Sequence, residues 1–278
     1  MRTRSFIASL CLIAGLLSAA PAEAQYGARR KSNLATGENY HVEVTGDLWD
    51  PNPDIVISSE QFGQIGDQVD FVNTLGISRT TFKQLKVVLR PGRKHKFRFE
   101  YTPIHYEAQK TITASFVFNG QRYNLGLPVT TELKWNAYRF GYEWDFVYRD
   151  RGFAGLVLDL KYTDITATLT ANVAGSSGVE FTHARAPIPA IGGIGRVYVV
   201  PNISITGEFT MFKLPERELN SDDYSGRYYD FDLYGTVNFN NNVGAQAGYR
   251  SFDMFYKVKK DNGTMKVDGL YFGIVGRF

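Results

Sequence analysis

Two carboxylates placed two residues apart are the strongest candidates for chemistry in this sequence. Asp230 and Asp232 stand in "YDFDLYG", and on a strand they would share one face about 7 Å apart. Paired carboxylates can activate water when one of them keeps its proton. The nearest candidate for a partner is His105-x-Glu107 in "PIHYEA". We treat this constellation as a hypothesis for a hydrolase, and salt bridging to Arg and Lys as the simpler expectation.

The other histidines offer no recognisable site. His183 in "EFTHARAP" lacks a serine at His-x-Ser spacing, which a lipid A deacylase would show, and we expect it in a solvated loop. His41 and His95 have no metal-ligand spacing to another ligand residue. No Gly-rich phosphate loop, G-x-S-x-G or Rossmann pattern occurs. We expect no enzyme constellation, no metal and no cofactor.

The elements that carry these residues are predicted to be strands. From Tyr40 onward apolar and polar residues alternate with period two, and the aromatics, 14% of the chain, concentrate there. The segment "YRFGYEWDFVY" places an aromatic at every second position from Tyr138 to Tyr148. The segments predict about ten strands, within roughly 8 to 12. Residues 50–80 stay ambiguous between a small helix in a loop and an uncounted strand.

Turn signals separate the strands. Tight connections are predicted at "RDRG", at Pro201-Asn202 and at "NNN", and long ones at 174–187 and 214–226. Asn262-Gly263 and the "NGQ" of 119–121 are further hairpin signals. Short and long connections alternate along the chain, which predicts one trimmed rim and one elaborated rim.

The start of the chain predicts export. Arg2 and Arg4, an apolar run and the A-x-A of Ala22 and Ala24 indicate a signal peptide over 1–24. The only cysteine, Cys11, lies inside the apolar run, which argues against a lipid anchor and leaves no thiol chemistry. We expect 25–38 to be a polar lead-in and 39–278 to form one domain. A net charge of +3 with no basic tract argues against nucleic acid as a partner.

Two observations bear on which strand face meets water. The six aromatics of 138–148 would need small partners inside a soluble barrel, yet neighbouring strands also present Phe, Tyr and Leu, and a narrow interior cannot hold that volume. Lipid accepts it, and a lipid-exposed sheet must close. We therefore predict an all-β fold, a closed antiparallel up-and-down transmembrane β-barrel. The residues predicted to face lipid include Tyr138, Phe140, Tyr142, Trp144, Phe146, Tyr229 and Phe231.

The opposite faces would then line the lumen with charges of both signs. These charges are either a polar path for small solutes or an interlocked network that plugs a narrow barrel, since charges out of bulk water need partners. The predicted lumen charges are Lys96, Arg98, Glu100, Arg139, Glu143, Asp145, Asp159, Lys161, Arg196, Glu208, Asp230, Asp232, Arg250, Lys266 and Asp268.

The last strand carries a resemblance. With Gly269, Tyr271, Gly273, Val275 and the terminal Phe278 it looks like the C-terminal assembly signal of bacterial outer-membrane proteins. The chain resembles the small single-chain barrels of the OmpA, OmpX and OmpW type. This resemblance implies a Gram-negative outer membrane with its lipid and lipopolysaccharide, insertion from the periplasm by the barrel-assembly machinery, and both termini on the periplasmic side. It names no external ligand.

Together these patterns predict a non-enzymatic, porin-like membrane protein with a structural or surface-interaction role and, as an open alternative, a narrow polar solute path. The loops at 174–187 and 214–226 are the expected places for binding, because loops carry function on such scaffolds. The second hypothesis is a membrane-embedded hydrolase that uses Asp230 and Asp232. The third, a soluble barrel that binds an apolar ligand, would require the aromatic faces to point inward.

Overall fold

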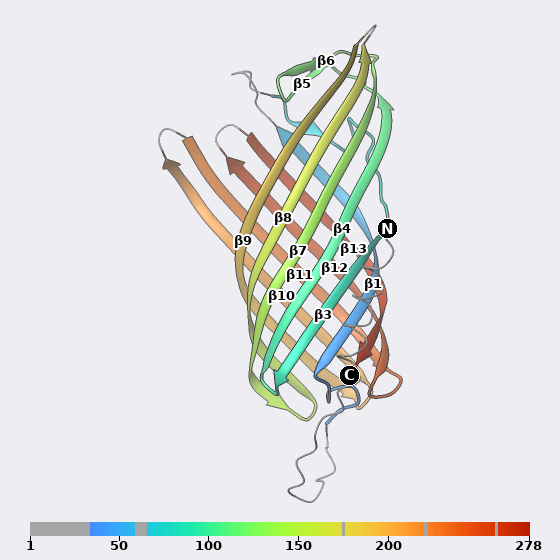
Figure 1. The fold of residues 1–278 in the computed structure, drawn as a ribbon, viewed down its shortest axis with the longest axis vertical. Coiled ribbons are helices and arrows are strands. Elements are labelled where there is room, and N and C mark those ends of the chain that lie inside the picture. The colour runs from blue at the N-terminus through green and yellow to red at the C-terminus, as the bar shows by residue number, and fades with distance from the viewer. Residues whose placement is uncertain (1–33, 59–65, 174–175, 220–221, 259–260) are drawn as a thin grey trace, which may run out of the picture. The chain divides into compact units, whose positions relative to one another are not determined.

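The computed structural model describes residues 34–58, 66–173, 176–219, 222–258 and 261–278, and among them the regular elements are strands (Figure 1). None of the described residues forms a helix long and apolar enough to cross a membrane. The strands are β1 (Val42–Ser58), β2 (Val69–Asp70), β3 (Phe82–Gly92), β4 (His95–Thr111), β5 (Phe116–Phe118), β6 (Gln121–Tyr123), β7 (Pro128–Arg149), β8 (Gly152–Val173), β9 (Ser176–Val200), β10 (Ile203–Leu219), β11 (Asp222–Asn238), β12 (Val243–Val258) and β13 (Asp261–Arg277).

Ten of these strands close into an antiparallel barrel. The order runs β1, β3, β4, β7 and then β8 through β13, each strand beside the next, and β13 pairs back onto β1 from Glu43↔Arg277 to Ser58↔Asn262. The prediction of a closed up-and-down barrel with about ten strands is confirmed. We call the end with the tight connections at 93–94, 150–151, 201–202 and 239–242 the turn end, and the opposite end the hairpin end.

The hairpin end carries the small strands. Residues 66–81 contain β2, which pairs with β1, and a single turn in which the Asp70 carboxylate accepts hydrogen bonds from the backbone N–H groups of Val72 and Asn73. In the ambiguous 50–80 segment, residues 50–58 therefore continue β1, 69–70 form β2 and 71–75 form this turn, while 59–65 lies outside the described residues. "NGQ" forms the predicted hairpin turn, with Asn119 and Gly120 at φ 51° and 77°. That hairpin, β5–β6, is however separate from β4 and β7.

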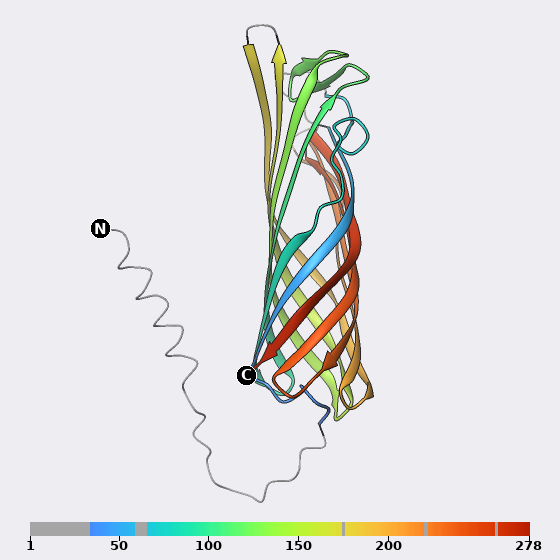
Figure 2. The ribbon, with the colours of Figure 1, turned by 90° about the vertical axis from the view of Figure 1, so that its right-hand side faces the viewer.

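Three turn predictions at the hairpin end are wrong. The 174–187 and 214–226 segments, expected as long loops, are mostly strand: β9 begins at residue 176, β10 runs to 219 and β11 starts at 222. Asn262 and Gly263 are not a turn either, because both pair with β12 inside β13. The elaborated rim is thus built from long strands, and Figure 2 shows the β8–β9 hairpin rising above its neighbours.

Around the barrel, near the turn end, the outward-facing side chains form an apolar belt. Trp144 and Phe146 are 43% and 47% exposed, and the side chains of Leu158, Phe209 and Phe272 are exposed on other strands. Stacked tyrosines mark the upper edge of the belt, where the Tyr101 and Tyr138 ring centroids lie 4.8 Å apart. We use "belt" for this surface throughout.

The alternation of β7 ends before Tyr148. A bulge between Trp144 and Val147 shifts the register with β8, so Tyr148 packs against the buried Phe153 while the belt aromatics before it face outward. A bulge re-aims the side chains that follow it. The expectation that the six aromatics share one face is therefore wrong for the sixth.

The barrel wall is split between β9 and β10 at the hairpin end. These strands pair from the turn end only as far as Ile191↔Met211, whereas β8–β9 pairing continues to Val173↔Ser176 and β10–β11 pairing to Leu219↔Asp222. In Figure 1 the upper parts of β9 and β10 diverge. We call this opening the β9/β10 notch.

Candidate functional site in the barrel interior

The two carboxylates singled out from the sequence both lie inside the barrel. Asp230 accepts hydrogen bonds from Lys161 Nζ at 2.6 Å and from the Arg250 guanidinium at 3.0 and 3.2 Å. Asp232 accepts one from the Tyr271 hydroxyl at 2.8 Å and lies 3.2 Å from Lys86 Nζ. Each carboxylate thus has its own cationic partners.

This arrangement bears directly on catalysis. A carboxylate pair activates water when the two groups share a proton, which requires that they interact mainly with each other. Here the polar contacts of Asp230 go to Lys161 and Arg250 instead, and those of Asp232 go to Tyr271 and Lys86. The partner considered from the sequence, His105 with Glu107, lies on the outer surface of β4 rather than in the lumen.

A continuous ion-pair network surrounds this pair at the level of the belt. Arg139 binds Glu208 and lies 2.7 Å from Asp159, and Arg98 links Glu208 at 2.7 Å to Glu143 at 3.3 Å. Lys96 contacts Glu143 and Asp145 at 2.5 and 3.0 Å, and Arg250 joins Glu100 to Asp230. The predicted lumen residues that lie inside the barrel are Lys96, Arg98, Glu100, Arg139, Glu143, Asp145, Asp159, Lys161, Arg196, Glu208, Asp230, Asp232 and Arg250.

The prediction of the lumen charges was wrong for two residues and missed several others. Lys266 and Asp268 face outward, since the inward positions of β13 are the odd ones. Asp47 and Lys86 were missed, although the alternation of Leu85 with Lys86 in "QLKVVLR" could have shown an inward lysine. Among the residues whose side chains the structure describes, the other charged residues missed inside the barrel are Glu38, Glu43, Arg90 and Arg277.

Residues 34–40 fill the turn end. The backbone N–H groups of Ala35 and Thr36 donate to carbonyls of two tight turns, Asp150 at 3.0 Å and Pro201 at 2.8 Å. Glu38 is buried and accepts from Arg196 Nη1 at 2.8 Å. We call residues 34–40 the entry segment. Part of the expected polar lead-in therefore packs into the barrel, while 1–33 lies outside the described residues.

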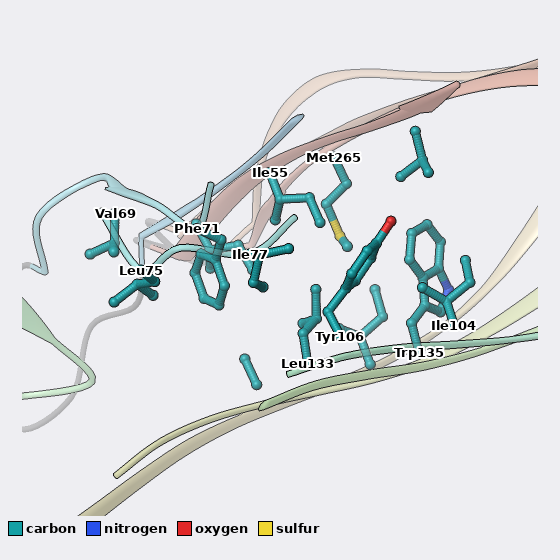
Figure 3. Close-up of a cluster of buried hydrophobic side chains, with 14 of the residues drawn as sticks. Ile55, Val69, Phe71, Leu75, Ile77, Ile104, Tyr106, Leu133, Trp135 and Met265 are labelled. Atoms are coloured by element: carbon teal, nitrogen blue, oxygen red, sulfur yellow. The ribbon is translucent and has the colours of Figure 1, made fainter. Parts of the chain in front are cut away.

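Above the ion network, that is, toward the hairpin end, the interior becomes apolar. Figure 3 shows Ile55 and Met265 on one wall and Ile104, Leu133 and Trp135 on the opposite wall, with side chains of 66–81 beside them. Tyr106 and Phe82 pack edge to face with centroids 5.0 Å apart. This layer could not be predicted separately, because on each strand its residues continue the alternation that also turns the charged residues inward.

One cluster on the outer surface has ligand-type atoms. His105, Glu107 and Glu132 bring three ligand atoms within 4.8 Å of one another, and they are the one such group of three among the described residues. Lys134 Nζ lies 2.5 Å from Glu132, and the hydrogen bond from this ammonium lowers the pKa of Glu132, which lies above the belt. The Lys134 ammonium thus already pairs with one of the carboxylates that a metal ion would need as a ligand.

The remaining histidines and the assembly residues can be placed. His95 contacts the Tyr142 hydroxyl at 2.6 Å, and His41 faces the Arg90 carbonyl at 3.3 Å. His183 belongs to β9 by its backbone, so the expected loop is wrong, and its side chain lies outside the described part. In β13, Tyr271 and Val275 are buried toward the interior, Gly269 and Gly273 share that inward parity, and Phe278 is exposed.

Comparison with known proteins shows the fold. No family model and no curated protein matches the sequence. The outer-membrane protease OmpT of Escherichia coli superposes with a TM-score of 0.55 at 9% identity, covering 88% of this chain and 99% of that one. The translocator domain of the autotransporter NalP from Neisseria meningitidis gives 0.47 at 10% identity, covering 86% and 89%. Ail of Yersinia pestis gives 0.37 at 8% identity, covering 86% and 99%.

The belt, the closed barrel and this likeness of fold define the class. An outward apolar surface on a closed antiparallel barrel suits lipid, because the ring of paired strands leaves no open sheet edge in the belt. The chain is an integral β-barrel protein of the Gram-negative outer membrane.

Proposed function

We propose that this protein is a sealed, non-enzymatic outer-membrane barrel that works in a structural or surface-interaction role, through its outer surfaces rather than through its lumen. The observation that carries the proposal is that buried side chains block the interior at the level of the belt. The ion network lies at belt level, with the apolar layer above it and the entry segment below. A barrel of about ten strands has an interior that side chains can fill.

A solute path is the finer alternative, and conductance tests it. We expect the purified barrel to give no stepwise current in planar lipid bilayers, whereas a general porin in the same bilayers does. The ion pairs around Arg139 and Arg250 would have to part for ions to pass, which costs several kcal/mol for each buried charge left unpaired. Regular current steps from the barrel alone would contradict the sealed interior.

A hydrolase is the second hypothesis, which the fold shared with a protease supports only at the level of architecture. The separate cation partners of Asp230 and Asp232 speak against a shared proton. We expect no turnover of phospholipid or peptide substrates above that of membranes without the protein. Turnover that Asp230→Asn abolishes, in a variant that still folds, would promote the hydrolase.

A further inference from the structure

The β9/β10 notch is encoded by prolines. In β9 the N–H of Tyr198 donates to Arg151 on the β8 side, and N–H directions alternate along an antiparallel strand, so odd-numbered residues of β9 direct theirs toward β10. Continuing the register past Ile191↔Met211 would require donors at 189 and then 187, and both residues are proline.

The facing strand has the same defect. Asn238 N–H donates to Asn202 on the β11 side of β10, so odd-numbered residues of β10 face β9. The residue that would lie opposite Pro187 is Pro215, which also lacks an N–H. Proline is tolerated in sheets where its missing donor faces no partner. Three prolines therefore keep the wall open above the last pair.

An apolar pocket lies behind this opening. Its volume is 460 Å³, within the range of about 300–1,000 Å³ typical of small-molecule sites. Residues of β8 through β13 line it, and most of them are at the inward-facing positions of their strands. The apolar lining includes Ile165, Ile188, Phe212, Leu214, Met254 and Tyr256.

The lower end of the pocket lies next to the ion network. Thr163, Ile188 and Tyr228 also border a small cavity beneath it, and Lys161 Nζ lies 4.5 Å from the centre of the Tyr228 ring. Residues of the ion network line this small cavity and not the pocket itself.

The notch begins where the belt ends. Ile191 and Met211, its lowest residues, are outward-facing and exposed, so the opening begins at the level where the lipid chains meet their headgroups. Arg185 and Arg227 also line the pocket, with side chains 59% and 46% exposed, and each has an aspartate neighbour at 3.1 and 3.5 Å. Partly exposed guanidinium groups keep donors for an anionic headgroup.

We propose that the pocket behind the β9/β10 notch takes one acyl chain of an anionic lipid from the surrounding outer leaflet. The hydrocarbon lies against Ile188 and Met254, and the headgroup remains at the mouth near Arg185 and Arg227. The strands need not separate further, because no backbone pairing closes the entrance.

Photolabelling tests this proposal with the wild-type protein. The processed barrel is placed in phosphatidylcholine vesicles that contain phosphatidylglycerol with a diazirine at one acyl end, irradiated, digested and mapped by mass spectrometry. We expect adducts on inward-facing Ile188 and Met254 besides those on the belt, and competition by unlabelled phosphatidylglycerol. Adducts confined to outward-facing residues would overturn the proposal.

Filled-pocket variants supply the second measurement. Ile188→Trp with Leu214→Trp should lower labelling at Met254 about tenfold, since the apolar contact area is already occupied. Leu158→Trp, on the belt away from the notch, should change nothing, and heat-modifiable gel mobility identifies folded variants. Unchanged labelling at Met254 in the filled variant would count against the pocket.

The probe itself distinguishes the sources of hydrocarbon. If a diazirine-bearing phosphatidylcholine labels Met254 as strongly as the phosphatidylglycerol does, the proposed preference for an anionic headgroup is refuted. If a diazirine alkane labels Met254 and neither lipid does, the proposal that the occupant is a lipid is refuted. The pocket would then be a site for free apolar molecules.

Discussion

At the scale of single residues, the interior is governed by charge neutralisation. Arg250 shows this most clearly, because one guanidinium serves both Asp230 and Glu100, from two different strands. Removing one member of a buried pair costs more than the pair contributes, since the remaining charge stays desolvated. The complete network of buried charges is therefore stable, whereas the loss of any single charged side chain from it should destabilise the barrel.

Arg250→Met tests this intolerance. Glu100 would lose its closest cation and Asp230 would keep only Lys161, which should destabilise the barrel by about 3–5 kcal/mol, measured by urea unfolding in detergent micelles. Arg227→Met is the matched control, because the Arg227–Asp253 pair is half exposed at 3.5 Å and should change stability by less than about 1 kcal/mol. Equal effects of both substitutions would refute the difference between buried and exposed pairs.

Alternation in the sequence predicts which residues point inward, but not which residues they contact across the lumen. Asp230 and Arg250 could be assigned to the lumen from their own strands, whereas Glu100 reaches Arg250 from the far wall. Such pairs depend on strand order and shear, which a single strand does not contain. The bulge before Tyr148 was equally invisible, because nothing in "WDFVY" marks an extra residue.

At the scale of elements, β9 and β10 determine where the ring opens. Restoring donors with Pro187→Thr, Pro189→Thr and Pro215→Thr should extend their pairing beyond Met211, because each substitution returns an N–H directed across the notch. The Lys213 amide should exchange more slowly than in the wild type, the new amides at 187 and 189 should be protected from exchange, and lipid labelling at Met254 should fall. Fast exchange at these amides in the variant would show that the β9/β10 notch has a cause other than the prolines.

The strand lengths were the weakest part of the element prediction. The segments 174–187 and 214–226 contain Gly, Ser, Pro and charged residues, a composition typical of loops. They are strands because each pairs across its own hairpin, β8–β9 and β10–β11. Pairing between neighbours outweighs local propensity there.

At the scale of the whole molecule, the barrel depends on the seam between its first and last strands. Phe278 accepts hydrogen bonds from the N–H groups of His41 and Val42 and donates to Val42 at 2.8 Å. The number of strands and their closure followed from the alternation together with the requirement that no edge remain in lipid. The notch did not follow, since it depends on the register of two strands.

Phe278 tests the seam and the predicted assembly signal together. We expect deletion of Phe278 and Phe278→Asp to lower the amount of heat-modifiable protein in washed outer membranes several-fold, while Phe278→Leu keeps it. Deletion removes the closing hydrogen bonds, and aspartate leaves the backbone but places a charge on the exposed face. An unchanged yield of Phe278→Asp would reject the side chain as part of the signal.

The entry segment has a consequence for the order of events during biogenesis. Glu38 lies inside the barrel between Arg90 and Arg196, four residues before β1, whose pairing with β13 closes the ring. A ring that closed with this segment outside would leave both guanidinium groups without this carboxylate in a dehydrated interior, and threading it in later would require those charges to be exposed again. Lateral closure should therefore come last in time, after the segment has entered.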